Sequence, residues 1–231
     1  MKPKPNLLFF IFSLVAIAEI SLLANDGESY RYLTKPLIIP SLAAIYLTSV
    51  RTKINPLKDA LLWGLAFSWM GDLLLQKEAY FVPGLASFLT AHVFYIFFFS
   101  RTVSQQTSFF KLRPVMLIAV IAYLVELLYL LWPHLGEMKI PVALYGVTIS
   151  VMLSAALWQY QKLDNQTALF FVIGALLFVI SDSILALNKF RSPFEQSGIF
   201  IMSTYILAQL FIVIGAIRYR NTIDSSLSEE A

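Results

Sequence analysis

Two carboxylates occur where the sequence is otherwise apolar enough to cross a lipid bilayer. Asp72 ends the stretch Ser68-Trp69-Met70-Gly71-Asp72, and Asp182 lies in Ser181-Asp182-Ser183. An ionised Asp inside a membrane is costly without a partner and usually has a function. If two such carboxyl groups meet in a cavity of low dielectric constant, repulsion and desolvation favour one shared proton, so that one group acts as an acid and the other as a base. Asp72 and Asp182 are therefore candidate catalytic residues.

The composition indicates what must position them. Of the 231 residues 58% are hydrophobic and 13% charged, and the mean hydropathy is +0.73, which is too apolar for one soluble core. We expect an all-α polytopic membrane protein, one bundle of about eight helices forming a single domain over 1–231 with short cytoplasmic tails at 1–6 and 221–231. The apolar runs fall at about 7–24, 33–50, 57–75, 81–100, 112–132, 138–158, 168–187 and 198–219.

Lys and Arg are distributed unevenly over the connections between these runs. Eleven lie on one side and six on the other, which predicts that both termini are cytoplasmic, in the inner or plasma membrane of the cell. Lys2 and Lys4 before a short apolar run also fit a signal peptide, but Glu19 inside the run favours a retained helix. The net charge of +3 follows from this bias, so no nucleic acid partner is expected.

Several kinds of chemistry lack the residues that they require. The chain has no cysteine and only two histidines, His92 and His134, which excludes thiolate chemistry and a histidine-rich metal cluster. It has no nucleotide-binding fingerprint and no serine nucleophile elbow. We therefore expect neither a cofactor nor a metal.

Embedded polar residues share one depth. Counting spans with alternating direction places nine of them in the extracytoplasmic half, which predicts one polar cavity opening outward. These nine are Glu19, Lys35, Asp72, His92, Glu126, Tyr145, Asp182, Tyr205 and Gln209. Helical spacing further places His92 and Tyr95 on one stripe, Ser68 one turn before Asp72, and Tyr205 one turn before Gln209.

A weak internal repeat is also visible. Glu19, Lys35-Pro36 and Asp72 recur in order as Glu126, Lys139-Ile140-Pro141 and Asp182. This pattern suggests a parallel repeat of four plus four spans, which would bring Asp72 and Asp182 face to face.

Structural roles remain open for the same residues. Glu19 can pair with Lys35, and His92 can be a hydrogen-bonded residue of the bundle. Tyr145 and Tyr205 can be interhelical hydrogen bonders, and each Asp can serve only to hold helices together.

The ordered motifs resemble one family. They are Lys35-Pro36, Ser68-x-x-Gly71-Asp72, Phe81-x-x-Gly84-Leu85-x-x-Phe88-Leu89-x-Ala91-His92-x-x-Tyr95, Gly174-Ala175-Leu176-Leu177-Phe178-x-x-Ser181-Asp182-x-x-Leu185-Ala186-x-x-Lys189-Phe190 and Tyr205-x-x-Ala208-Gln209. Over residues 35–209 this pattern is similar to the YhhN family, the lysoplasmalogenases. The resemblance implies an integral membrane hydrolase of the vinyl ether bond of lysoplasmalogens, which releases a fatty aldehyde and glycerophospho-ethanolamine or glycerophospho-choline.

The chemistry that the resemblance implies suits the polar residues. Two carboxyl groups suffice to protonate a vinyl ether and to guide water to the resulting cation. Cations near the outward mouth can hold the lipid phosphate, and the other polar groups can orient water or a glycerol hydroxyl. The proposed substrate-binding residues are Lys35, Ser68, His92, Tyr95, Tyr145, Ser181, Lys189, Tyr205 and Gln209, with Glu19 and Glu126 in support.

Two other functions use similar residues. A proton-coupled transporter or flippase of a lysolipid would also bury titrating carboxylates and could use the repeat. An intramembrane aspartyl protease is disfavoured, because Trp69-Met70-Gly71-Asp72 lacks its additional glycine.

Overall fold

Eight α-helices make up most of the residues that the structure describes. The computed structural model describes residues 5–25, 27, 30–51, 54–102, 114–159 and 163–229, with side chains described as far as 223. The helices are α1 (Pro5–Ala24), α2 (Arg31–Ser49), α3 (Ala60–Leu74), α4 (Phe81–Arg101), α5 (Pro114–Leu131), α6 (Lys139–Gln159), α7 (Asn165–Ala186) and α8 (Ser197–Glu229). Each predicted apolar run corresponds to one helix, so the predicted all-α bundle is confirmed.

The helices differ in how far they reach. Six of them, all but α2 and α3, are long and apolar enough to cross a membrane, which makes the chain an integral membrane protein. Helix α3 has only 15 residues, about 22 Å at the helical rise per residue, and is shorter than a bilayer core. Helix α8 has 33 residues and continues through most of the segment expected as a tail from 221. Lys2, Lys4, Lys53, Lys111, Arg113 and Lys162, which contributed to the charge bias, lie outside the described residues.

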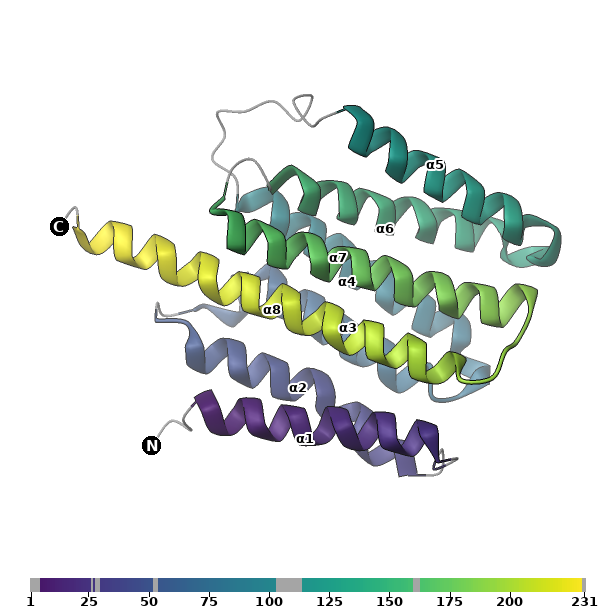
Figure 1. The fold of residues 1–231 in the computed structure, drawn as a ribbon, viewed down its shortest axis with the longest axis horizontal. Coiled ribbons are helices and arrows are strands. Elements are labelled where there is room, and N and C mark those ends of the chain that lie inside the picture. Colours follow the sequence, from purple (N-terminus) through teal and green to yellow (C-terminus); the bar gives the residue numbers. More distant parts are fainter. Residues whose placement is uncertain are drawn as a thin grey trace.

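The helices lie side by side and reverse direction at each connection (Figure 1). Helices α3, α4, α7 and α8 form the middle of the bundle, with the hairpins α3–α4 and α7–α8 packed most extensively. Helix α2 packs on α8 and α6 packs on α4, while α1 covers α2 and α5 covers α6 on opposite flanks. We call the end where α1 begins and α8 ends the termini end, and the end where α3 joins α4 and α7 joins α8 the hairpin end.

Two prolines within α2 show how the membrane-embedded backbone is satisfied. Pro40 has no N–H to bond to the carbonyl of Pro36 one turn earlier. The indole Nε1 of Trp69 donates to that carbonyl at 2.9 Å. A freed backbone group inside a membrane needs such a partner, and this one fixes α3 against α2.

Glycines allow the central helices to approach closely. A Cβ at Gly71 would lie 2.5 Å from the ring of Phe88, and one at Gly64 would lie 2.4 Å from the ring of Tyr95. A Cβ at Gly174 on α7 would meet backbone atoms of α8, 3.0 Å from the carbonyl oxygen of Ala208. Small residues at helix contacts are the usual means of close packing in membranes.

This packing makes Gly174→Ala destabilising. Backbone cannot move aside cheaply, so the added methyl group must separate α7 from α8 and should lower the free energy of unfolding by about 1–3 kcal/mol. Thermal unfolding in detergent measures the loss. Gly146→Ala is the matched control, because its Cβ would meet only the flexible tip of Leu124 and alanine favours the helix. Equal melting temperatures for the two variants would contradict the prediction.

Candidate functional site

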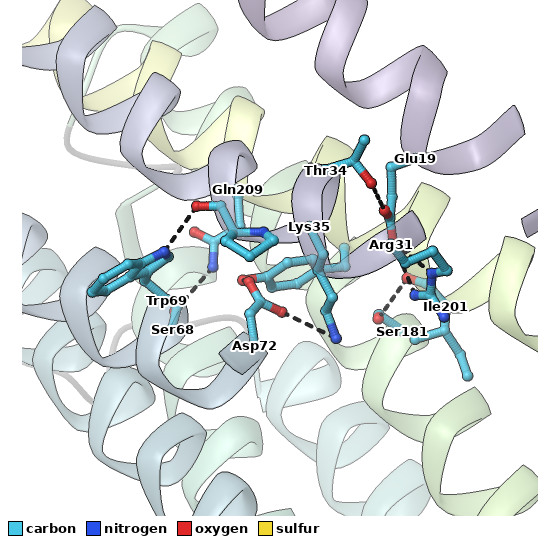
Figure 2. Close-up of polar contacts among 12 residues, drawn as sticks. Glu19, Arg31, Thr34, Lys35, Ser68, Trp69, Asp72, Ser181, Ile201 and Gln209 are labelled. Carbon is cyan, nitrogen blue, oxygen red and sulfur yellow. Dashed lines mark hydrogen bonds and ion pairs between the residues drawn. The ribbon is translucent and has the colours of Figure 1, made fainter. Parts of the chain in front are cut away.

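Asp72 lies near the end of α3, at the hairpin end of the bundle, and is 2% exposed. Its Oδ2 accepts a hydrogen bond of 2.6 Å from the hydroxyl of Tyr205 on α8, and its Oδ1 lies 3.6 Å from Nζ of Lys35 on α2. Figure 2 shows Lys35 and Gln209 on opposite sides of the carboxylate. The Lys35 ammonium compensates the charge of Asp72, which explains how an Asp is accommodated at this depth.

A closed hydrogen-bond ring lies beside Asp72. Tyr95 donates to Oε1 of Gln209 at 2.8 Å, and Nε2 of Gln209 donates to Oγ of Ser68 at 3.0 Å. The Ser68 and Tyr95 oxygens are 3.2 Å apart; because the Tyr95 proton is already used, Ser68 must donate there. The ring is buried, joins α3, α4 and α8, and gives each hydroxyl a defined orientation.

Asp182 on α7 has a different surrounding. Tyr145 on α6 donates to its Oδ2 at 2.5 Å, and Nε2 of His92 on α4 lies 3.7 Å from the same oxygen. The carbonyl of Phe88 interacts with the imidazole, yet neither ring nitrogen makes a well-formed hydrogen bond to the described residues. The Asp182 side chain is 14% exposed, so it is the more accessible of the two carboxyl groups.

Aromatic rings lie between the two carboxyl groups. Phe178 packs edge-on against Tyr205, the donor to Asp72, with ring centroids 5.5 Å apart, and against His92, the neighbour of Asp182, at 4.6 Å. Phe88 packs against both Phe178 and Tyr205. No hydrogen bond joins the two carboxyl groups in the described part of the chain. Phe178 thus links the surroundings of the two carboxyl groups, since it contacts a neighbour of each.

The two surroundings draw on helices at equivalent places in the predicted repeat. Asp72 on α3 meets residues of α2 and α8, and Asp182 on α7 meets the corresponding helices α6 and α4. The spacing from Lys35 to Asp72 equals the spacing from Tyr145 to Asp182. At this spacing Tyr145 stands to Asp182 as Lys35 stands to Asp72, whereas the sequence motifs align Lys35 with Lys139.

No hydrogen bond or ion pair in the described part of the chain joins four of the expected residues to either Asp. Glu126 is exposed on the outer flank of α5, so it does not support the site. Glu19 pairs with Arg31 at 2.9 Å rather than with Lys35. Ser181 donates to the Ile201 carbonyl at 2.9 Å and ties α7 to α8. Lys189 pairs with Glu78 at 2.6 Å at the rim, where Glu78 is largely exposed.

Other contacts were missed by sequence reasoning. Thr34 donates to Oε2 of Glu19 at 2.5 Å, and Arg31 sits one turn before Lys35, so helical spacing could have found this cluster. Tyr123 on α5 hydrogen-bonds Ser183, directly after Asp182. The other tyrosine of α5, Tyr129, is 78% exposed, and the sequence does not reveal which of the two faces α7.

An apolar groove of about 360 Å³ leads to Tyr123. It runs between α5, α6 and α7 and is lined by Met116, Ala119, Val120, Tyr123, Leu153, Leu157, Val172, Leu176, Val179 and Ile180. Its length along α7, from Val172 to Ile180, is about 12 Å at the helical rise per residue. The groove ends one turn or less from Asp182.

Comparison with known proteins now defines the family. The model of the YhhN family matches residues 30–216, which include α2 to α7, most of α8 and both Asp centres. The chain belongs to the YhhN family. The match begins after α1, so Glu19 lies outside it. No solved structure is significantly similar.

Named relatives of this YhhN protein occur in distant organisms. The chain is 37% identical to the lysoplasmalogenase TMEM86B of Homo sapiens over 67% of its own length and 62% of that protein. It is 34% identical to the human lysoplasmalogenase TMEM86A over 74% of this chain and 70% of that one. A lysoplasmalogenase of Mycobacterium tuberculosis is 30% identical over 70% and 62% of the two chains. The chain thus spans less than two thirds of some of these relatives.

The hydrogen-bond ring gives a test of structure. Tyr95→Phe removes one hydroxyl and leaves Gln209 and Ser68 each short of a buried partner, which should cost about 1–3 kcal/mol of stability. Thermal unfolding in detergent measures this cost. Tyr129→Phe, at a side chain 78% exposed, should change the melting temperature little. A Tyr95→Phe protein as stable as the control would show that the ring is not formed.

Proposed function

We propose that this YhhN protein hydrolyses the vinyl ether bond of lysoplasmalogens. The relatives named lysoplasmalogenase supply the substrate class. The observation that carries the proposal is the pair of membrane-embedded carboxyl groups, which have different partners and whose surroundings are linked by Phe178. The membrane-embedded position suits a substrate with one hydrocarbon chain.

The reaction needs one proton donor and one activated water. A proton is added to the vinyl carbon remote from oxygen, and this leaves an oxocarbenium ion. Water adds to the cation and loses a proton, and the resulting hemiacetal separates into a fatty aldehyde and a glycerophospho-ethanolamine or glycerophospho-choline. One water is consumed, and the proton taken from the acid is returned. Glycosidases stabilise a similar cation with two carboxyl groups.

The different partners of Asp72 and Asp182 support different roles for them in the reaction. Lys35 holds a compensating charge on Asp72, so Asp72 serves as the carboxylate that stabilises the cation and accepts the water proton. Asp182 has no Lys or Arg partner among the described contacts and is the more exposed group, so it serves as the acid. His92, with two nitrogens free of well-formed hydrogen bonds, is placed to orient water. Tyr145 and Tyr205 hold the carboxyl groups in position.

The alkenyl chain has a matching groove. We place it between α5, α6 and α7, because this groove is apolar and ends at Tyr123, whose partner Ser183 adjoins Asp182. The phosphate would then lie near the hairpin end, where the exposed pair of Lys189 and Glu78 can open to receive it. Arg191 is also exposed there.

The carboxyl assignment predicts that Asp72→Asn and Asp182→Asn each lose activity. Removing a general acid or base should lower kcat by about 100- to 10,000-fold. The assay uses purified protein in detergent with a lysoplasmalogen and a matched ester lysolipid, and it measures aldehyde and fatty acid. Glu195→Gln, at an exposed loop residue, should behave as wild type. Folded Asp variants with normal aldehyde release would overturn the mechanism, and fatty acid release by the wild type would indicate an esterase.

The groove assignment predicts a selective loss of binding. Ala119→Phe should obstruct the groove, and losing about two buried CH₂ groups would raise KM roughly tenfold for long chains. The same change should affect a short-chain substrate much less. Ala122→Phe is the matched control, because Ala122 is exposed on α5 outside the groove lining. Equal KM values for the two variants would place the chain elsewhere.

A lipid transporter is the second candidate. The repeated surroundings of Asp72 and Asp182 favour it, since related halves around a polar centre are typical of secondary transporters. Reconstituted vesicles distinguish the two functions. A lysolipid that crosses the bilayer intact without aldehyde release would favour transport.

A further inference from the structure

A positively charged hollow lies at the termini end, away from both Asp centres. It is lined by Lys58, Ala60, Phe98, Arg101, Thr102, Tyr219 and Arg220 and measures about 170 Å³. Ala60 and Asp72 are twelve residues apart on α3, which corresponds to about 18 Å along the helix. This hollow is therefore separate from the proposed hydrolytic site.

The cations outnumber their anionic partners. Arg220 pairs with Asp59 at 2.9 Å, and Asp59 also accepts from Tyr46 and from the backbone N–H groups of Leu61 and Leu62. Lys58 and Arg101 make no ion pair with any residue that the structure describes. The Nε of Arg220 is buried and has no hydrogen-bond partner there either. The two positive charges of Lys58 and Arg101 thus remain for a ligand.

A second hollow continues the first over the lipid-facing surface. It measures about 380 Å³, shares Lys58, Ala60 and Arg101, and is otherwise lined by Leu57, Trp63, Phe94 and Phe97. Trp63 stacks on Phe94, with ring centroids 6.0 Å apart, and its Nε1 donates to the Leu57 carbonyl at 3.2 Å. A Trp anchored beside cations at a helix end is typical of the membrane interface.

We propose that these joined hollows bind an anionic phospholipid, with its phosphate between Lys58 and Arg101 and an acyl chain along Trp63, Phe94 and Phe97. Basic pockets between membrane helices bind acidic lipid headgroups, and the adjoining aromatic surface gives the chain a place that a soluble phosphate would not use. A zwitterionic lipid fits less well. The lining has no acidic residue to meet its amine, and the buried Asp59 already has four donors.

Trp63 provides a direct measurement. Protein in vesicles is exposed to brominated phosphatidylglycerol or brominated phosphatidylcholine, either of which quenches nearby tryptophan fluorescence. The Trp63 contribution is obtained by subtracting the fluorescence of the Trp63→Phe variant. Each interfacial cation raises the affinity for an anionic lipid about fivefold, which corresponds to roughly 1 kcal/mol. We expect the anionic lipid to reach half-maximal quenching at a mole fraction about tenfold lower, or lower still, than the zwitterionic lipid needs. Lys58→Gln combined with Arg101→Gln should remove this preference.

Lys77→Gln combined with Lys139→Gln is the matched control, because it removes two cations at the hairpin end. This control should keep the preference. Equal quenching by both lipids, or a preference that survives loss of Lys58 and Arg101, would overturn the proposal. Should the double variant fail to fold, the wild type alone tests the proposal. A preference for the anionic lipid that does not weaken as the salt concentration rises also contradicts the proposal. Displacement by inorganic phosphate, beyond that caused by sulfate at equal ionic strength, would assign the site to a soluble phosphate.

Discussion

The structure depends on compensating two carboxyl groups inside an apolar bundle. A carboxylate at this depth is tolerated only with donors or cations close to it, and no single helix supplies them here. Asp72 needs α2 and α8, and Asp182 needs α6 and α4. Each Asp therefore fixes three helices relative to one another, and the same contacts that lower the cost of burial define the geometry available for chemistry.

Tight packing and the polar centre support each other. Gly64 and Gly71 bring α4 close enough for Tyr95 to reach the Ser68 and Gln209 ring and for Phe88 to stand beside Tyr205. Helix α8 is held to both ends of α3, by Tyr205 on Asp72 and by Arg220 on Asp59. Because both ends of α3 are fixed in this way, the central helices form a rigid frame. The peripheral helices α1 and α5 cover only one face each, and α5 leaves the groove that leads toward Asp182.

The sequence predicted the depth of each polar residue along its helix better than the direction in which its side chain points. Hydropathy located all eight helices, and alternating direction placed Lys35, His92, Tyr145 and Gln209 at the level of the Asp residues, where the structure brings them together. The same counting placed Glu126 at that level, but Glu126 faces outward on α5. Depth follows from residue number at a fixed rise per residue, whereas direction depends on rotation about the helix axis. In α5 a single carboxylate among apolar residues marks a depth but does not show which side of the helix faces the bundle.

By itself, the sequence determined an all-helical membrane bundle, because length and apolarity leave few other ways to satisfy the backbone in lipid. It also determined which residue types are available for acid-base chemistry. Only the tertiary structure decided the partners: that Lys35 meets Asp72 and not Glu19, that Tyr145 donates to Asp182, and that Lys58 and Arg101 meet in one hollow. These pairings join residues distant in the chain, and they depend on how helices rotate and pack against several neighbours at once.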